Sequence, residues 1–444
     1  MDNYQTQKTR SGLKVLVVKR PKNPKMIHLQ YVLGIGSDLE TGRQLEITHF
    51  LEHLFVSLTS KKYPDSKINR ELLSRNNITY TASIGTKNTV HEFSFRKTKL
   101  DLFLDLMVNA IMDYRVDRNI FKNEQNSIVE ELHEIIDDSL YNLDNYTDDM
   151  IYRGHYRTQS QKLRLANTQK MTQAQIQHFW EKYYRHPYAV LAVYGAVDIK
   201  TLVKKIDQIE KDIKSKYDMS SPLNNKSLVE LYKPYKTRDE SKLLFMRKDD
   251  TISTLKIGWR IDMNMFTHDF YKIYALDYIL INDLNSLLLK KLRTERGLIY
   301  DIESHFSLDE FQNDLSFYVF QTTVSSKNLL RVISAFLEVI DYLTKNKIKE
   351  ENFRKYIETQ EQFALDRNEN IDYTSNLTNY ARSYLWGHNI VTQSEEDKNY
   401  INLTREDILR VSKNVFTTNN LYISYANNQN LNTKINEILD SQDF

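Results

Sequence analysis

The chain has 444 residues, of which 41% are hydrophobic and 27% charged, a balance typical of globular proteins and a length too great for one compact core. Its net charge of +2 and its low mean hydropathy exclude the strongly basic surface of a nucleic-acid binder and the long apolar span of a membrane protein. Cysteine is absent, so any metal must be held by His, Asp or Glu.

Hydrophobic patterning predicts short strands and long helices. The first apolar run, residues 13–18, predicts a strand and is too short for a signal sequence, so we expect a cytoplasmic protein. Further along the chain we expect strands at 27–33, 90–95, 189–194, 254–259, 315–320 and 421–425, and helices at 47–58, 100–114, 119–137, 173–184, 271–291, 327–344 and 351–366. Consecutive strands and paired helices favour an α+β fold.

Two distant segments repeat the same residue pattern. Thr172 and Thr404, which lie 232 positions apart, each precede a helical pattern as its N-cap, and a turn and an apolar strand follow in both. Tyr184 and Phe416 match at the same offset. The repeat predicts two homologous α/β-roll domains with mixed or antiparallel sheets and helices packed on one face. We expect them at residues 1–218 and 241–444, joined by a polar linker at 219–240.

One short segment carries a pattern typical of metal-binding sites. Residues 47–55 read ITHFLEHLF, in which His49, Glu52 and His53 form an H-x-x-E-H motif. On a helix, residues four apart project from one face, so both imidazoles can bind one zinc ion. Glu52 is placed to accept a proton from water rather than to bind the metal. The alternative is an amphipathic helix whose two histidines share a polar face.

An acidic helix supplies candidates for the third protein ligand that a catalytic zinc ion needs. Within residues 121–138 stand Glu124, Glu130, Glu131 and Glu134. Glu124 and Glu131 are two helical turns apart on one face, which suits one metal ligand and one supporting acid. The alternative is an ordinary solvated face of charged residues.

The motif and the acidic helix together resemble the pitrilysin/insulinase family of inverted-motif zinc peptidases. The length and the repeat are most similar to its mitochondrial processing peptidase-like branch, and the likeness covers nearly the whole chain. Residues 36–40, GSDLE, look like the family's strand-to-helix turn, and residues 128–132, IVEEL, look like its ligand segment.

This resemblance assigns roles to the candidate residues. It implies one Zn²⁺ per chain, bound by His49, His53 and Glu131, with Glu52 as the general base and Glu124 as the second family glutamate. The activity it implies is that of a zinc metalloendopeptidase.

The second half of the chain adds a further family segment. Residues 292–300, LRTERGLIY, look like the family's L-R-E-x-x-G-L-x-Y, which implies that Arg293 and Tyr300 contact the substrate carbonyl and the transition state. At the repeat offset of 232, Tyr356 and Phe363 stand where the first half has its two glutamates. Only the first copy can therefore hold a metal.

Several positions depart from the family pattern. Thr48 replaces the usual alanine before the first histidine, and Thr294 replaces a glutamate. Thr81 and Ala82 stand where the family has an Asn-Ala pair on the strand that receives the peptide, so we expect an extended peptide to bind beside them.

The resemblance also implies a larger assembly. Four homologous domains enclose a chamber in the family, and this chain supplies two, so we expect a homodimer or a heterodimer with a related chain, and neither nucleic acid nor membrane as partner. Such a chamber would admit extended peptides and unfolded segments. The alternative function is a non-catalytic or partner-dependent subunit of a related peptidase complex.

Overall fold

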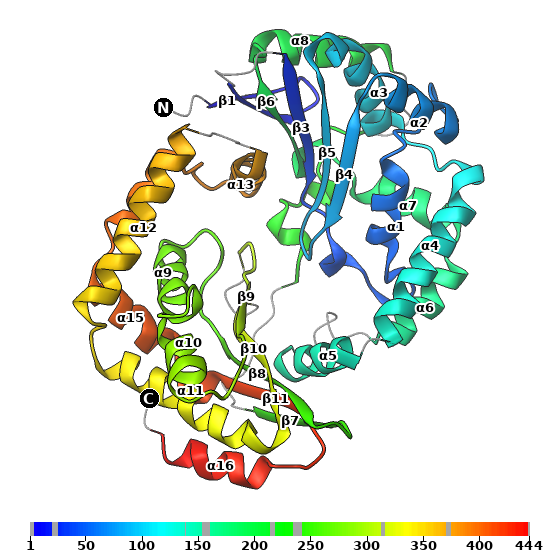
Figure 1. The fold of residues 1–444 in the computed structure, drawn as a ribbon. Coiled ribbons are helices and arrows are strands. Elements are labelled where there is room, and N and C mark those ends of the chain that lie inside the picture. The colour runs from blue at the N-terminus through cyan, green and yellow to red at the C-terminus, as the bar shows by residue number, and fades with distance from the viewer. Residues whose placement is uncertain are drawn as a thin grey trace. The chain divides into compact units, whose positions relative to one another are not determined.

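The computed structural model describes residues 4–19, 25–137, 139–152, 160–213, 218–233, 242–311, 316–369 and 374–442. The chain forms two compact units, each of which is discontinuous in sequence (Figure 1). The first unit contains residues 1–137, 159–233 and 372–393, and the second unit contains residues 138–158, 234–371 and 394–444. In the described residues no helix has the length and apolar character needed to cross a membrane.

The first unit is built on a six-stranded mixed sheet of order β1-β2-β6-β3-β5-β4. Its strands pair antiparallel except for the parallel pair β2 and β6. They are β1 (Tyr4–Lys8), β2 (Lys14–Val18), β3 (Met26–Leu33), β4 (Thr79–Ile84), β5 (Thr89–Arg96) and β6 (Ala189–Gly195). The helices of this unit are α1 (Ile47–Phe55), α2 (Ser66–Arg75), α3 (Leu100–Asp113), α4 (Arg118–Asp137), α6 (Gln161–Lys170), α7 (Gln173–Tyr183), α8 (Ile199–Asp212) and α13 (Thr374–Trp386).

The second unit repeats this plan around a five-stranded sheet of order β7-β11-β8-β10-β9. Its strands are β7 (Lys242–Arg247), β8 (Ile252–Arg260), β9 (Glu303–Ser307), β10 (Phe317–Ser325) and β11 (Leu421–Asn427). Its helices are α5 (Ser139–Ile151), α9 (Asp269–Ile281), α10 (Leu287–Leu289), a single-turn π-helix (Lys290–Glu295), α11 (Leu329–Lys345), α12 (Glu350–Glu369), α14 (Gln393–Ile401), α15 (Arg405–Val415) and α16 (Asn432–Asp440).

The repeat predicted from sequence is present in detail. Thr172 and Thr404 both form complete capping boxes, at the start of α7 and α15. Each helix has 11 residues and is followed by a 3₁₀ turn and a fully buried seven-residue strand, β6 or β11. Helices α4 and α12 both have 20 residues, and α5 and α13 both have 13. The duplicated α+β architecture is therefore confirmed.

The sequence predicted helices on one face of each sheet. In the structure, one further helix also covers the opposite face of each sheet. In the first unit Tyr31 stacks on Phe55 of α1, while Gln30 bonds Thr378 of α13 at 2.9 Å. Neighbouring strand residues point to opposite faces, so α1 and α13 cover opposite faces of one sheet. In the second unit α5 takes the corresponding place: Thr147 bonds Ser424 of β11 at 2.6 Å.

Each of these two helices packs on the sheet formed mainly by the other half of the sequence. Helix α13 comes from the second half but packs on β2, β3 and β6, and α5 comes from the first half but packs on β7 and β11. The compact units therefore do not follow the expected division at 218 and 241. Of the expected linker, residues 219–233 belong to the first unit, where Tyr232 donates to the carbonyl of Gly34 at 2.9 Å, and residues 234–240 lie outside the described residues.

The expected helix at 271–291 is wrong in one respect, because it is interrupted after Ile281. The Asp283 carboxylate accepts the backbone N–H of Asn285 at 2.7 Å, and the Asp283 carbonyl accepts the N–H of Ser286 at 2.9 Å. A short polar side chain that bonds its own backbone competes with the helix, and the chain restarts as α10 and the π-helix.

His91 of β5 lies in the core of the first unit. Its ring is fully buried between Phe55 and Tyr31, and neither ring nitrogen has a hydrogen-bond partner among the described residues. Burial lowers the pKa of His91 to about 3. The folded protein therefore keeps this imidazole neutral under conditions in which the unfolded chain protonates it.

This buried histidine predicts loss of stability in acid. As pH falls below about 6.5 the unfolded state binds a proton that the folded state does not, which costs about 1.4 kcal/mol per pH unit until the folded pKa is reached. His91→Phe should lose less free energy of unfolding than the wild type between pH 7.5 and pH 5, measured by urea denaturation. His305→Gln, at an exposed position, is the control, and equal pH slopes for His91→Phe and the wild type would contradict the prediction.

Candidate metal centre

A buried glutamate from the preceding turn holds the start of helix α1. Glu40, at the end of the turn predicted to precede this helix, accepts the backbone N–H groups of Glu46 and Thr48, each at 2.9 Å, and the hydroxyl of Thr48. These bonds satisfy orphan donors at the helix N-terminus, where a carboxylate also meets the positive end of the helix dipole. Thr48, a departure from the family pattern, is thus used to anchor the helix that carries the motif.

The two histidines of α1 meet the carboxylate of α4 predicted from sequence. His49 Nε2 lies 3.5 Å from one oxygen of Glu131, and His53 Nε2 lies 3.8 Å from the other. One donor atom from each of the three residues falls within 4.8 Å of the others, the only such group among the described residues. Glu130, its neighbour on α4, is exposed and is not part of the group.

The three donors fit a zinc ion. Two imidazole nitrogens and one carboxylate oxygen are a common catalytic zinc set, and bonds of about 2.0–2.1 Å in tetrahedral geometry separate the ligand atoms by about 3.3 Å. The separations of 3.5 and 3.8 Å, each to a different oxygen of Glu131, approach that value, and one donor atom from each of the three residues lies within 4.8 Å of the others. Glu131 keeps 46% of its side chain exposed, so solvent reaches the donor group from its side.

Each histidine is held from behind by a glutamate and an arginine. His53 Nδ1 contacts Glu124 at 3.1 Å, and Arg70 of α2 donates to the other oxygen of Glu124 at 2.9 Å. His49 Nδ1 contacts Glu46 at 2.9 Å, and Arg164 of α6 donates to its other oxygen at 2.7 Å. We call these the His53 chain and the His49 chain.

The charges of these chains shift the pKa values of their members. Burial raises the pKa of Glu46 and Glu124, but bonds from their histidines and arginines outweigh it and hold both pKa values below the ordinary value. Burial lowers the pKa of His49, but Glu46 outweighs it and raises the pKa. Burial and the charge of Glu46 raise the pKa of Glu40 to about 7. Carboxylates that remain ionised are the better acceptors for an Nδ1–H, which leaves each Nε2 lone pair for a metal.

Glu52 lies beside the donor group without joining it. Its carboxylate is 3.7 Å from His53 Nε2, its side chain is only 13% exposed, and burial raises its pKa. An acid of raised pKa at the edge of a metal site is a suitable proton acceptor and donor.

The predicted peptide-binding residues lie on the edge of the sheet. Thr81 and Ala82 belong to β4, which pairs with β5 and ends the strand order in the described sheet. Thr81 is exposed and Ala82 half-buried, and β4 packs near α1. An edge strand keeps backbone groups that an extended peptide can pair with.

Arg293 and Tyr300 belong to the second unit. Arg293 lies in the π-helix, and its guanidinium is 4.7 Å from the centre of the Tyr300 ring, which is 78% exposed. The turn between them contains Gly297 at φ 57°, a left-handed conformation that favours glycine. The structure thus places Arg293 and Tyr300 in contact with each other.

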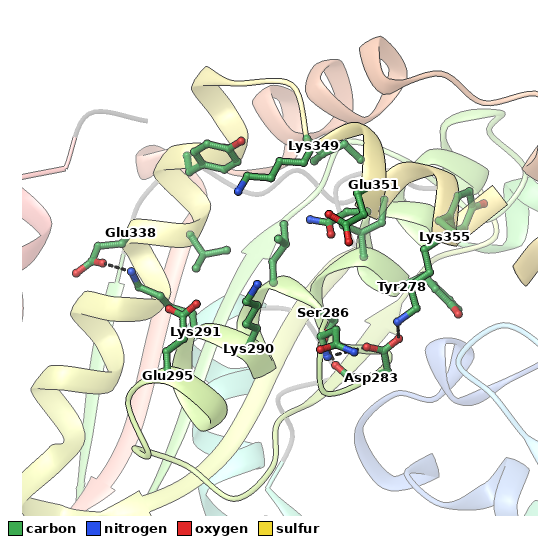
Figure 2. A pocket seen from close by; sticks show the side chains of 18 residues that line it. Tyr278, Asp283, Ser286, Lys290, Lys291, Glu295, Glu338, Lys349, Glu351 and Lys355 are labelled. Carbon is green, nitrogen blue, oxygen red and sulfur yellow. Dashed lines mark hydrogen bonds and ion pairs between the residues drawn. The ribbon is translucent and has the colours of Figure 1, made fainter. Parts of the chain in front are cut away.

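The second unit also contains a cavity of about 680 Å³, shown in Figure 2. Ion pairs cross its rim, from Lys355 to Asp283 at 2.6 Å and from Lys291 to Glu338 at 3.1 Å. It is lined by residues of α9 to α12, including Tyr356, and by none of the predicted site residues. The cavity has the volume of a small-molecule site but not the donor set of a metal centre.

Three residues of these two chains were not predicted from the sequence: Glu46, Arg70 and Arg164. Glu46 precedes His49 by three residues, a helical spacing that was available as a signal. Arg164 lies 118 residues from Glu46, and Arg70 lies 54 residues from Glu124, so no local pattern pairs them.

Comparisons with known proteins place the chain in a family. Two family models match it: Insulinase (Peptidase family M16) over residues 15–183, and Peptidase M16 inactive domain over residues 170–360. The chain therefore belongs to the insulinase, or pitrilysin, family of peptidases.

Relatives and solved structures agree with this assignment. An uncharacterized zinc protease of Rickettsia felis is 21% identical and covers 94% of this chain and 96% of its own length. One of Bacillus subtilis is 20% identical over 69% of this chain and 71% of its own. A protease structure from Helicobacter pylori has a TM-score of 0.81 at 18% identity, over 96% of this chain and all of that one (100%).

A Pseudomonas fluorescens structure described as a peptidase M16 inactive domain is also similar, with a TM-score of 0.82 at 13% identity over 96% of this chain and 99% of that one. The shared fold thus occurs both in a structure described as a protease and in one described as an inactive peptidase domain.

The donor group predicts one zinc ion per chain. His53→Ala should lose stoichiometric zinc, and chelation of the wild type should lower its Tm, because a ligand at 100 times its Kd stabilises the folded state by about 2.7 kcal/mol. Metal analysis and thermal unfolding with and without EDTA measure both effects. Glu130→Gln is the matched control, since it removes an exposed carboxylate next to Glu131 and should bind zinc like the wild type. Equal zinc content in His53→Ala and the wild type would contradict the assignment.

Proposed function

We propose that the protein is a zinc-dependent endopeptidase that hydrolyses extended peptides or unfolded segments. The observation that carries the proposal is the convergence of His49, His53 and Glu131 in one donor group, with Glu52 beside it. Membership of a peptidase family and relatives named as zinc proteases support the same reaction class.

In this proposal the chain's own residues divide the chemistry between them. Zinc held by His49, His53 and Glu131 would supply a Lewis acid that polarises the scissile carbonyl and makes water a stronger nucleophile. Glu52 accepts a proton from the attacking water as its oxygen bonds the carbonyl carbon. When the C–N bond breaks, Glu52 returns the proton to the leaving nitrogen. Glu124 keeps His53 oriented throughout.

The substrate is proposed to bind as an added strand. A peptide paired with β4 near Thr81 and Ala82 would lie extended, and backbone pairing accepts most side chains. Arg293 and Tyr300 are proposed to donate to the carbonyl oxygen as negative charge develops on it. An enclosed chamber would require a second chain, as a homodimer or with a related protein, and this assembly remains part of the proposal.

A non-catalytic or partner-dependent subunit is the competing function. The threonine at position 81, where the family pattern has an asparagine, favours it. The match to a domain described as inactive covers residues 170–360, which exclude the donor group and Glu52. The intact donor group and the intact Glu52 argue against it, because a subunit without catalysis has no need for them.

Glu52→Gln separates the two functions. The variant keeps the shape of the side chain but cannot accept a proton, so cleavage of a quenched peptide library should fall by about 10²–10⁴-fold while zinc content is unchanged. Glu134→Gln, which removes an exposed carboxylate from α4, is the matched control and should cleave like the wild type. A zinc-loaded wild type that cleaves no peptide, alone or with a related chain, would contradict the proposed endopeptidase activity and favour the role of a non-catalytic subunit.

A further inference from the structure

We propose that Glu46 is a positioning residue that orients His49 for metal binding, as Glu124 does for His53. The inference rests on the proposed metal site but not on the identity of the reaction. Glu46 stands at the N-cap of α1, one turn before His49, and its side chain is 10% exposed. It has no role in the sequence motif.

Both oxygens of the Glu46 carboxylate are engaged away from the metal side. Oε2 contacts His49 Nδ1 at 2.9 Å, and Oε1 accepts from Arg164 at 2.7 Å. His49 presents its other nitrogen, Nε2, to Glu131. Glu46 is therefore placed to hold the imidazole from behind and not to act as a fourth ligand.

The backbone of Glu46 is in a conformation that glutamate disfavours. Its φ is 75° and its ψ is 3°, in the left-handed region. The other residues of this kind among the described, non-glycine part of the chain are Leu58 and three asparagines, Asn77, Asn224 and Asn225, and asparagine tolerates this region better than glutamate does. A strained backbone retained at a buried position points to a use for its side chain.

The surroundings hold this conformation in place. The N–H of Glu46 donates to Glu40 at 2.9 Å, and its carbonyl accepts the N–H of Phe50 at 2.9 Å as the first turn of α1. Arg164, which is 13% exposed, also lies 3.7 Å from Glu40. The carboxylate of Glu46 is thus fixed from its backbone and from its far oxygen before any metal binds.

The two chains behind the histidines have the same construction. Each runs from an arginine on another helix to a buried glutamate and then to a histidine Nδ1, with glutamates 10% and 15% exposed. A carboxylate acceptor fixes the tautomer with Nδ1–H and directs the Nε2 lone pair outward. With only Glu124 present, one imidazole would be fixed and the other free to rotate.

Zinc affinity and cobalt spectra of Glu46 variants test this role. We expect Glu46→Gly and Glu46→Gln to raise the Kd for zinc about 10–100-fold, measured by competition with a chromophoric chelator. The d–d absorption of the Co²⁺-loaded variants should differ from that of the wild type, because His49 is no longer held in one orientation. Glycine adopts the left-handed backbone conformation without strain, and Arg164 retains its ion pair with Glu40. Metal-free Glu46→Gly should therefore unfold at a Tm no lower than that of the wild type.

Asn77→Gly is the matched control, since it makes the same backbone change at an exposed left-handed position after α2 and should leave zinc affinity and the cobalt spectrum unchanged. Wild-type zinc affinity and spectrum in both Glu46 variants would overturn the inference, as would a fall in Tm without loss of affinity, which a purely structural role predicts. If Glu46→Gly fails to fold, Glu46→Gln carries the test. A wild type that binds no zinc would instead refute the proposed metal site.

Discussion

The hydrogen bond from each histidine Nδ1 to a buried carboxylate is the interaction on which the candidate metal centre depends. An imidazole on a helix can rotate and change tautomer, and only a fixed acceptor directs both Nε2 atoms to one point. A buried carboxylate is itself costly unless a cation compensates it, and Arg70 and Arg164 do so from α2 and α6. Three helices and the turn at Glu40 must therefore be in place before the two histidines of α1 can share a metal.

The second copy of the unit shows that this fold does not require the centre. Tyr356 stands where the first copy has Glu124, and it is fully buried in the core of the second unit. Asp277 of α9 accepts hydrogen bonds from Ser304 and Tyr318 instead of supporting a histidine. A buried aromatic side chain stabilises the packing of its helix without any charged partner. A carboxylate buried at the same position needs a paired positive charge. One copy of the unit thus contains the donor group, and at the matching position the other has a buried aromatic residue.

Much of the fold followed from local patterns. The capping boxes at Thr172 and Thr404, the helices that follow and the buried strands β6 and β11 depend on neighbouring residues, and the repeat made them visible twice. The packing of α5 and α13 on the sheets of the other halves was not predicted, because a helical pattern in the sequence does not determine which sheet the helix packs on. Their faces are decided by contacts such as Thr147 with Ser424, 277 residues apart.

The same division holds for the site. The sequence by itself determined that His49 and His53 share a face, because helical geometry requires it, and that Glu124 and Glu131 lie two turns apart on a second helix. Only the tertiary structure decided that Glu131, and not the exposed Glu130, meets the histidines, and that a left-handed Glu46 supports one of them. Helical spacing is a property of the chain over a few residues, whereas the pairing of a glutamate with an arginine 118 residues away exists only when the helices pack.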